Sequence, residues 1–354
     1  MNLVSIAAIT LAFGLIVFFH EAGHFLAARL SGMAVHEFSF GIGRPLLFWV
    51  KRGETQYSFR LWPFFSYVRV AGMEPGDEHP QGFSKKSRLA QAFVLVMGCL
   101  MNFMLAVGIY IVMGTVLGLP VPEPRVREVM PDTPAARAGL LPGDELVGVG
   151  SKTGLSVDEI REAIQEHPGK PLDLEIEREG EAKTISITPM VEEAYELKGL
   201  RIQKVPIGLI GIRFDFTRKQ AGVGESIVLG FRETVAMIQF QAAGLVGVIT
   251  RQVPPDVMGP VGVVHTMYGE AQSGWAEFLS MFALIAVAIG FVNLLPIPAL
   301  DGSRLVIVAL EAIRRKPFDK QKESLVHLIG FGLLLALVVV VTYKDILRIV
   351  TGGE

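Results

Sequence analysis

Residues 11–24 read LAFGLIVFFHEAGH, in which an apolar run passes directly into a polar segment with two histidines. The apolar part extends back to residue 3, and a helix needs about 20 such residues to cross a bilayer. No basic stretch precedes the run, and no small-residue cleavage site follows it. We therefore expect a retained membrane span over residues 3–19 rather than a signal peptide.

Three further apolar runs have the same character and cover residues 90–119, 276–298 and 325–343. Hydrophobic residues make up 51% of the chain and charged residues 19%, and the mean hydropathy is +0.45. Soluble domains carry about 25% charged residues. The sequence therefore predicts a polytopic α-helical membrane protein with about four transmembrane helices. A fifth apolar segment, 234–250, is short and contains two glutamines, so we expect an amphipathic helix at about 225–250.

The formal net charge of −2 provides no basic field, so nucleic acid is not an expected partner. The loops nevertheless differ in charge, and basic residues in short loops favour the cytoplasmic side of a membrane. Residues 29–88 hold nine basic and five acidic residues, and residues 299–324 hold six and four. Residues 123–200 hold nine basic and 17 acidic residues. We expect the first two loops inside and the third outside, although Lys344 and Arg348 after the last span argue mildly against a C-terminus outside.

The polar segment at the end of the first run, His20-Glu21-Ala22-Gly23-His24, has the spacing HExxH. Residues four apart share a helix face, so both imidazoles can reach one metal ion with Glu21 beside it. Two histidines and a carboxylate suit zinc and leave a fourth position open for water, as in catalytic zinc sites. Glu21 would then act as the general acid and base. Ionisable groups in a membrane helix are costly and are usually functional.

Asp301 is the expected third metal ligand, in the segment NLLPIPALDG at residues 293–302. The two prolines of this segment break the helix, so Asp301 can lie on an inward-facing turn. In the four-span topology the first and third spans run in the same direction. His20, His24 and Asp301 are then expected at comparable depth near the cytoplasmic side.

The region between the second and third spans has alternating apolar residues and turns, which predict a small inserted α/β domain. Its segment GLLPGD at 139–144 resembles the GLxxGD signature of bacterial PDZ domains, and residues 156–167 fit the helix that flanks the peptide site of such domains. PDZ domains bind an extended peptide as an added strand. A peptide ligand is therefore a possible partner, and an insert that only gates access is the alternative.

Taken together, these motifs resemble the site-2 protease family of intramembrane zinc metalloproteases, in its bacterial form with one PDZ domain. The resemblance covers nearly the whole chain and includes a GxxxN motif at residues 98–102. It implies that His20, His24 and Asp301 bind zinc and that Glu21 is catalytic. Asn102 and Asn293 match positions near the active site and are expected to bind substrate, with helix packing as the alternative. The chain departs from the usual motifs in having Ser303 after Gly302 and Cys99 after Gly98.

The family resemblance also implies substrates and location. Family members cut single-pass membrane proteins, often anti-sigma factors or signal-peptide remnants, by regulated intramembrane proteolysis. The expected location is the inner membrane of a bacterium, with lipid as a partner, the PDZ-like domain outside and the active site near the cytoplasm. Residues 36–70 are expected to form a membrane-associated β-hairpin, because the family has a β-loop there that is thought to pair with substrate.

The expected organisation has four parts. They are an N-terminal membrane part (1–119), a PDZ-like domain (120–200), a linker with the amphipathic helix (201–275) and a C-terminal membrane part (276–354). Two other functions remain open at this point. One is a non-catalytic membrane scaffold with a bound metal, although structural zinc normally has four protein ligands. The other is a divalent-metal transporter, although the chain lacks repeated halves with interrupted helices.

Overall fold

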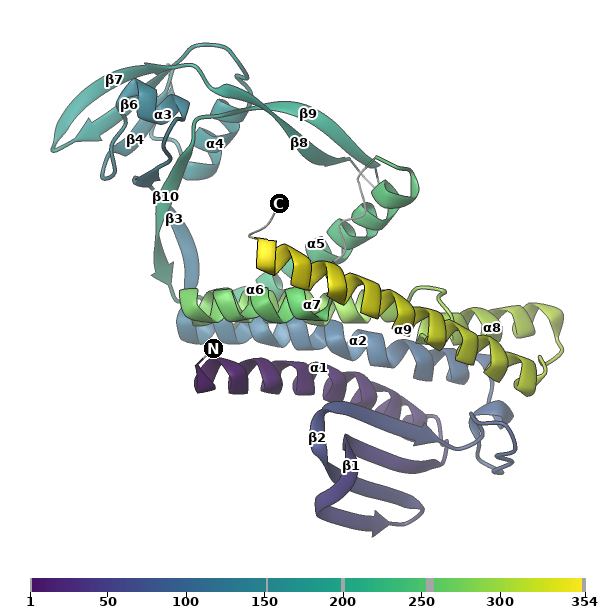
Figure 1. Cartoon of the computed structure of the whole chain (residues 1–354). Coiled ribbons are helices and arrows are strands. Elements are labelled where there is room, and N and C mark those ends of the chain that lie inside the picture. The colour runs from purple at the N-terminus through teal and green to yellow at the C-terminus, as the bar shows by residue number, and fades with distance from the viewer. Residues whose placement is uncertain (1, 151, 199–200, 253–257, 352–354) are drawn as a thin grey trace. The chain divides into compact units, whose positions relative to one another are not determined.

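The computed structural model describes residues 2–150, 152–198, 201–252 and 258–351. The chain divides into two compact units (Figure 1). The helical unit comprises residues 1–113, 224–241 and 255–354, and the inserted unit comprises residues 114–223 and 242–254. Each unit is described by itself below.

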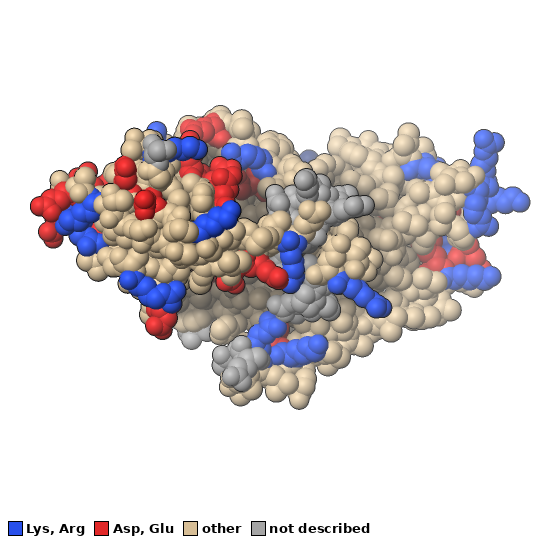
Figure 2. All heavy atoms as spheres, turned by 90° about the horizontal axis from the view of Figure 1, so that it is seen from above, with Lys and Arg blue, Asp and Glu red and all other residues tan. Residues whose placement is uncertain are grey.

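Four helices are long and apolar enough to cross a membrane, as the sequence predicts. They are α1 (Leu3–Leu30), α2 (Arg88–Val112) with the π-helical turn η2 (Met113–Leu117), α7 (Trp275–Asn293) and α9 (Lys320–Thr351). Residues other than Lys, Arg, Asp and Glu make up most of the face seen in Figure 2. The expected amphipathic segment lies in α5 (Val223–Ile249), which is not among the four.

The helical unit is built around α2, which packs against α1, α7 and α8 (Asp301–Arg314) (Figure 1). A side chain at Gly23 of α1 would overlap the carbonyl of Met97, so glycine permits the close approach of α1 and α2. The short helix α6 (Pro260–Ser273) contacts α1, α7 and α9. Asp345 of α9 is buried and accepts hydrogen bonds from the Gly259 and Gly262 amides at the start of α6, where the helix dipole favours a carboxylate.

Strands β1 (Val35–Arg52) and β2 (Thr55–Val70) form the expected hairpin, but it curls back on itself. Residues 37–40 pair on one side with 56–59 and on the other side with 66–69. The hairpin packs against α1, where Phe18 and Phe25 contact Phe38 with ring centroids 5.9 and 5.0 Å apart. Aromatic contacts of this kind fix the hairpin on the part of α1 that carries the histidines.

The inserted unit contains a sheet in the order β10-β3-β4-β6-β7, with β5 paired to β4. Its elements in chain order are β3 (Leu119–Val129), α3 (Pro134–Ala138), β4 (Glu145–Val149), β5 (Lys152–Thr153), α4 (Val157–Gln165), β6 (Leu172–Arg178), β7 (Glu181–Ile187), β8 (Met190–Lys198), β9 (Arg201–Leu209) and β10 (Ile212–Lys219). Strands β8 and β9 form a separate pair. Helix α4 lies within the segment 156–167 where the sequence predicts a helix; it begins with a capping box of Ser156 and Glu159 and buries Val157, Ile160 and Ile164.

The structure continues the insert beyond residue 200, where the sequence analysis expects a linker to begin. Strand β10 pairs with β3 from Ile212↔Val129 to Lys219↔Leu119, so the last strand of the unit lies beside its first. Local pattern could not place this boundary, because β10 has partners only through a pairing across about 90 residues of chain.

The aspartate of the GLLPGD segment stabilises the inserted unit. Asp144 is 1% exposed and receives hydrogen bonds of 2.6 and 2.7 Å from the Arg178 guanidinium and one of 2.9 Å from the Leu141 amide. The bond from Arg178 is the main reason that the pKa of Asp144 lies below its ordinary value. Asp144 therefore ties the turn at 139–144 to β6.

Replacing Asp144 with alanine is expected to lower the free energy of unfolding of the inserted unit by about 2–4 kcal/mol, because a buried ion pair loses one partner. Since the folded pKa is depressed, this stabilisation is present above the unfolded pKa and is lost as pH falls through the folded pKa. Urea-dependent proteolysis of the full chain measures both effects. Glu193→Ala, which removes an exposed ion pair, should change stability by less than about 0.5 kcal/mol.

Candidate active site

Helix α1 carries the HEAGH segment well before its end, because the helix continues to Leu30. His20 and His24 are both buried, and their Nε2 atoms lie 3.2 Å apart. The two rings meet nearly at right angles, with an interplanar angle of 88°. The spacing of four residues therefore brings both imidazoles to one point.

Asp301 reaches the same point from a different helix. Its Oδ2 atom lies 3.0 Å from His20 Nε2 and 3.1 Å from His24 Nε2. The three atoms form a nearly equilateral triangle with sides of 3.0–3.2 Å. In a tetrahedral zinc site with bonds of 2.0–2.2 Å, neighbouring ligand atoms lie about 3.4 Å apart. The donor set and its geometry thus fit zinc and leave one coordination position outside the triangle.

The break after α7 explains how Asp301 arrives there. Helix α7 ends at Asn293, before Pro296 and Pro298, and Ala299 takes a left-handed conformation with φ of 81°. The Ala299 amide donates to His327 Nδ1 of α9 at 3.0 Å, which holds this turn. The sequence analysis did not single out His327 for any role at the site. Ser303, in place of the usual second glycine, donates to the Leu300 carbonyl at 2.7 Å and fits the turn.

A hydrogen bond at Nδ1 fixes the tautomer of the His24 ring. His24 Nδ1 lies 2.8 Å from the carbonyl oxygen of Val94 on α2, so the Nδ1–H donates and Nε2 is left with its lone pair towards the triangle. The facing residue of α2 is Gly98, where a side chain would overlap the ring of His24. The glycine of the GxxxN motif therefore makes room for the imidazoles. Cys99 beside it is buried, and its Sγ atom lies within 4.8 Å of donor atoms of His20 and Asp301.

Glu21 is next to the triangle and contacts the hairpin. Its Oε2 atom accepts a hydrogen bond of 2.9 Å from the backbone amide of Val68 on β2. The carboxylate is thus held between α1 and the strand segment 66–70. The sequence could not predict this contact, since it depends on how the hairpin curls.

A cavity of about 640 Å³ opens at these residues. This volume lies within the range of small-ligand and peptide sites. Its lining includes the side chains of the triangle and of Glu21. The other lining residues include Tyr67, Met73, Ile289, Asn293, Leu300 and Arg304. Asn293 is part of this lining, whereas Asn102 is fully buried in α2 and is not.

Tyr67 and Arg304 are cavity residues that the sequence analysis missed. Tyr67 belongs to a polar cluster inside the hairpin, in which Glu37 receives hydrogen bonds from Tyr67, Ser58 and Arg60. Burial would raise the pKa of Glu37, but these hydrogen bonds outweigh it and hold the pKa below its ordinary value. An ionised Glu37 and its partners thus fix the strand that contacts Glu21.

Comparison with known proteins gives a match to peptidase family M50 over residues 8–337. The chain belongs to this family. The match confirms the resemblance inferred from the motifs, and this M50 peptidase is therefore a zinc metalloprotease.

Curated relatives align over nearly their whole length. Zinc metalloprotease RasP of Oceanobacillus iheyensis is 31% identical over 98% of this chain and 99% of the relative, and that of Geobacillus kaustophilus is 32% identical over 98% of each. Regulator of sigma-W protease RasP of Bacillus subtilis is 28% identical over 98% of this chain and 99% of the relative. Each of these alignments thus covers nearly the whole of both proteins.

Proposed function

We propose that this M50 peptidase hydrolyses a peptide bond within or near the transmembrane segment of single-pass membrane proteins. One observation carries the proposal. The triangle of His20, His24 and Asp301 atoms lies on helices and turns of a unit whose four long apolar helices could cross a membrane. A hydrolytic site in such a unit has access to substrates that soluble proteases do not reach.

His20, His24 and Asp301 would hold the zinc ion of this family. When bound, zinc supplies a Lewis acid that polarises the scissile carbonyl and makes water easier to deprotonate. Glu21 would accept the proton of the attacking water at its carboxylate and pass it to the leaving nitrogen. Its position beside the triangle supports this role.

The substrate helix must unwind before it is cut, because helical carbonyls are already hydrogen-bonded and shielded. The strand segment 66–70 supports a way to hold an unwound segment. It pairs with residues 35–40 along one edge, and Val68 on its other edge faces Glu21. A substrate strand added beside Val68 would lie next to the site. The amide of Asn293 in the cavity wall could then bond to the substrate backbone.

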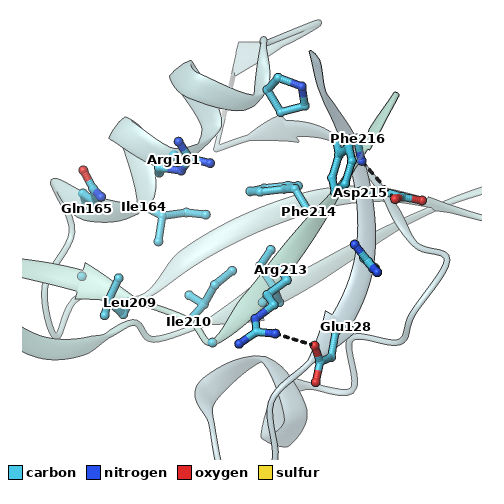
Figure 3. A pocket seen from close by; sticks show the side chains of 15 residues that line it. Glu128, Arg161, Ile164, Gln165, Leu209, Ile210, Arg213, Phe214, Asp215 and Phe216 are labelled. Atoms are coloured by element: carbon cyan, nitrogen blue, oxygen red, sulfur yellow. Dashed lines mark hydrogen bonds and ion pairs between the residues drawn. The ribbon is translucent and has the colours of Figure 1, made fainter. Parts of the chain in front are cut away.

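We also propose that the inserted unit is a PDZ-like domain on the outer side of the membrane. A groove of about 790 Å³ lies along α4 and β10 (Figure 3). Ile164 of α4 and Phe214 of β10 project into it, and β10 is the last strand at its end of the sheet. A strand edge beside a groove lined by apolar and charged side chains supports peptide binding by strand addition, and the unit would also exclude large outer domains.

The substrates that we propose are membrane-bound anti-sigma factors and signal-peptide remnants, cut after another protease has shortened them. The name of the Bacillus subtilis relative, which refers to sigma-W regulation, supports the first class. Family membership favours catalysis over the scaffold and transporter functions. The bacterial inner membrane, with both chain ends outside, is the proposed location.

Reconstitution in liposomes tests the proposal. A tagged single-span substrate with a short outer domain should be cut, a zinc chelator should stop cleavage, and added zinc should restore it. A long outer domain should slow cleavage, and removal of residues 119–219, the whole of the sheet-containing insert, should restore the rate. Cleavage that persists without zinc would contradict the metal-dependent mechanism.

A further inference from the structure

The two histidines of the triangle differ in the partner of their second ring nitrogen. His24 Nδ1 has the Val94 carbonyl at 2.8 Å. His20 Nδ1 is buried and has no hydrogen-bond partner among the residues that the structure describes. Histidines that bind metals almost always donate this second N–H to an acceptor, which fixes the ring and its tautomer. An acceptor for His20 is therefore required.

Asn102 also has buried polar atoms without hydrogen-bond partners among the described residues. Its side chain is 0% exposed, and neither its oxygen nor its nitrogen has a hydrogen-bond partner within the described parts of the chain. An amide buried without partners costs roughly 1–3 kcal/mol. A leucine would fill such a helix interface without that cost, so a specific role explains the asparagine better than packing does.

Helix geometry places both groups near Gly98. A Cβ atom at Gly98 would lie 3.0 Å from His20 Cε1, the ring carbon between Nδ1 and Nε2. Asn102 follows Gly98 by four residues and shares its face of α2. Helical side chains lean towards the preceding turn, so the Asn102 amide extends towards Gly98. Gly98 has no side chain that would separate this amide from the His20 imidazole.

We infer that Asn102 is the positioning residue for His20. Its Oδ1 atom accepts the His20 Nδ1–H hydrogen bond through one buried water, which leaves Nε2 as the metal-binding nitrogen. Helix α2 would then orient both histidines, His24 through the Val94 carbonyl and His20 through Asn102. This role replaces the substrate contact expected from the motif and rests on the zinc site of the proposed function.

Zinc affinity of the purified full-length protein, measured by competition with a chromophoric chelator, tests the inference without any substrate. Asn102→Leu should weaken zinc binding about 10–100-fold. Asn102→Asp keeps an oxygen acceptor and should stay within about threefold of the wild type. Asn293→Leu is the matched control, since that amide lines the cavity, and it should lower cleavage while leaving zinc affinity unchanged.

Two further readouts separate positioning from a structural role. The metal-free Asn102→Leu protein should unfold within a few degrees of the wild type, because the acceptor lost to His20 is offset by removal of the buried amide nitrogen, which has no partner among the described residues. With cobalt in place of zinc, the visible absorption spectrum should change in Asn102→Leu and not in Asn293→Leu.

If a folded Asn102→Leu protein bound zinc as tightly as the wild type, the role of Asn102 would be overturned and the proposed function would stand. Equal weakening in Asn102→Leu and Asn102→Asp would also overturn it, since the acceptor would then not matter. A wild-type protein that binds no zinc would instead overturn the proposed function, on which the inference rests.

Discussion

Replacing Glu21 with glutamine is expected to lower the cleavage rate of a single-span substrate by about 10²–10⁴-fold, the usual contribution of a general acid and base. Glutamine has nearly the same shape and can still accept the hydrogen bond from the Val68 amide. It cannot take a proton from water at neutral pH. Bound zinc, measured by atomic emission on the same samples, should remain at the wild-type level.

Glu74→Gln provides the matched control, because it makes the same chemical change at an exposed position of the loop that follows β2. Its rate should equal that of the wild type. If Glu21→Gln cut the substrate within threefold of the wild-type rate, the carboxylate could not be the proton carrier.

The second large effect is expected at Asp301. Replacing it with asparagine substitutes a neutral amide for the carboxylate that meets both imidazoles, and amides are poor zinc ligands. We expect zinc affinity to fall by at least about 100-fold, and cleavage to fall with it. Titration with excess zinc should restore part of the lost activity.

Asp319→Asn, at an exposed position after α8, is the control for Asp301 and should leave both quantities unchanged. An Asp301→Asn protein with wild-type zinc affinity would show that the triangle is not the metal site. Loss of activity at full zinc occupancy would assign Asp301 a different role.

The helices and the triangle could be predicted because their signals are local. Apolar length predicts a spanning helix, and a spacing of four residues predicts a shared helix face. The turn that carries Asp301 was predictable because two prolines end the preceding helix. These arguments need no knowledge of how distant segments pair.

The parts that were missed depend on tertiary pairing. Residues 201–219 read as linker, yet they contain β9 and β10, and β10 pairs with β3. The curl of the hairpin, which brings Val68 to Glu21, follows from pairing on both sides of residues 37–40. Sequence pattern specifies the strands of such a sheet better than their partners.

Asn102 illustrates the same limit on a helix. The motif shows that Gly98 and Asn102 share a face, but whether that face meets the cavity depends on the rotation of α2. Packing against Gly290 of α7 sets this rotation, since a side chain there would contact the carbonyl of Cys99 and Cβ of Asn102. Asn102 is thereby buried between helices, away from the cavity lining.

The most direct test of the account is to locate the bond that is cut. The wild-type protein and a tagged single-span substrate would be reconstituted in liposomes, and the products would be sequenced by mass spectrometry, with Glu21→Gln as the inactive reference. We predict that the new chain ends lie within the apolar segment of the substrate or at its cytoplasmic edge. Chain ends found only in the soluble parts of the substrate would contradict intramembrane cleavage.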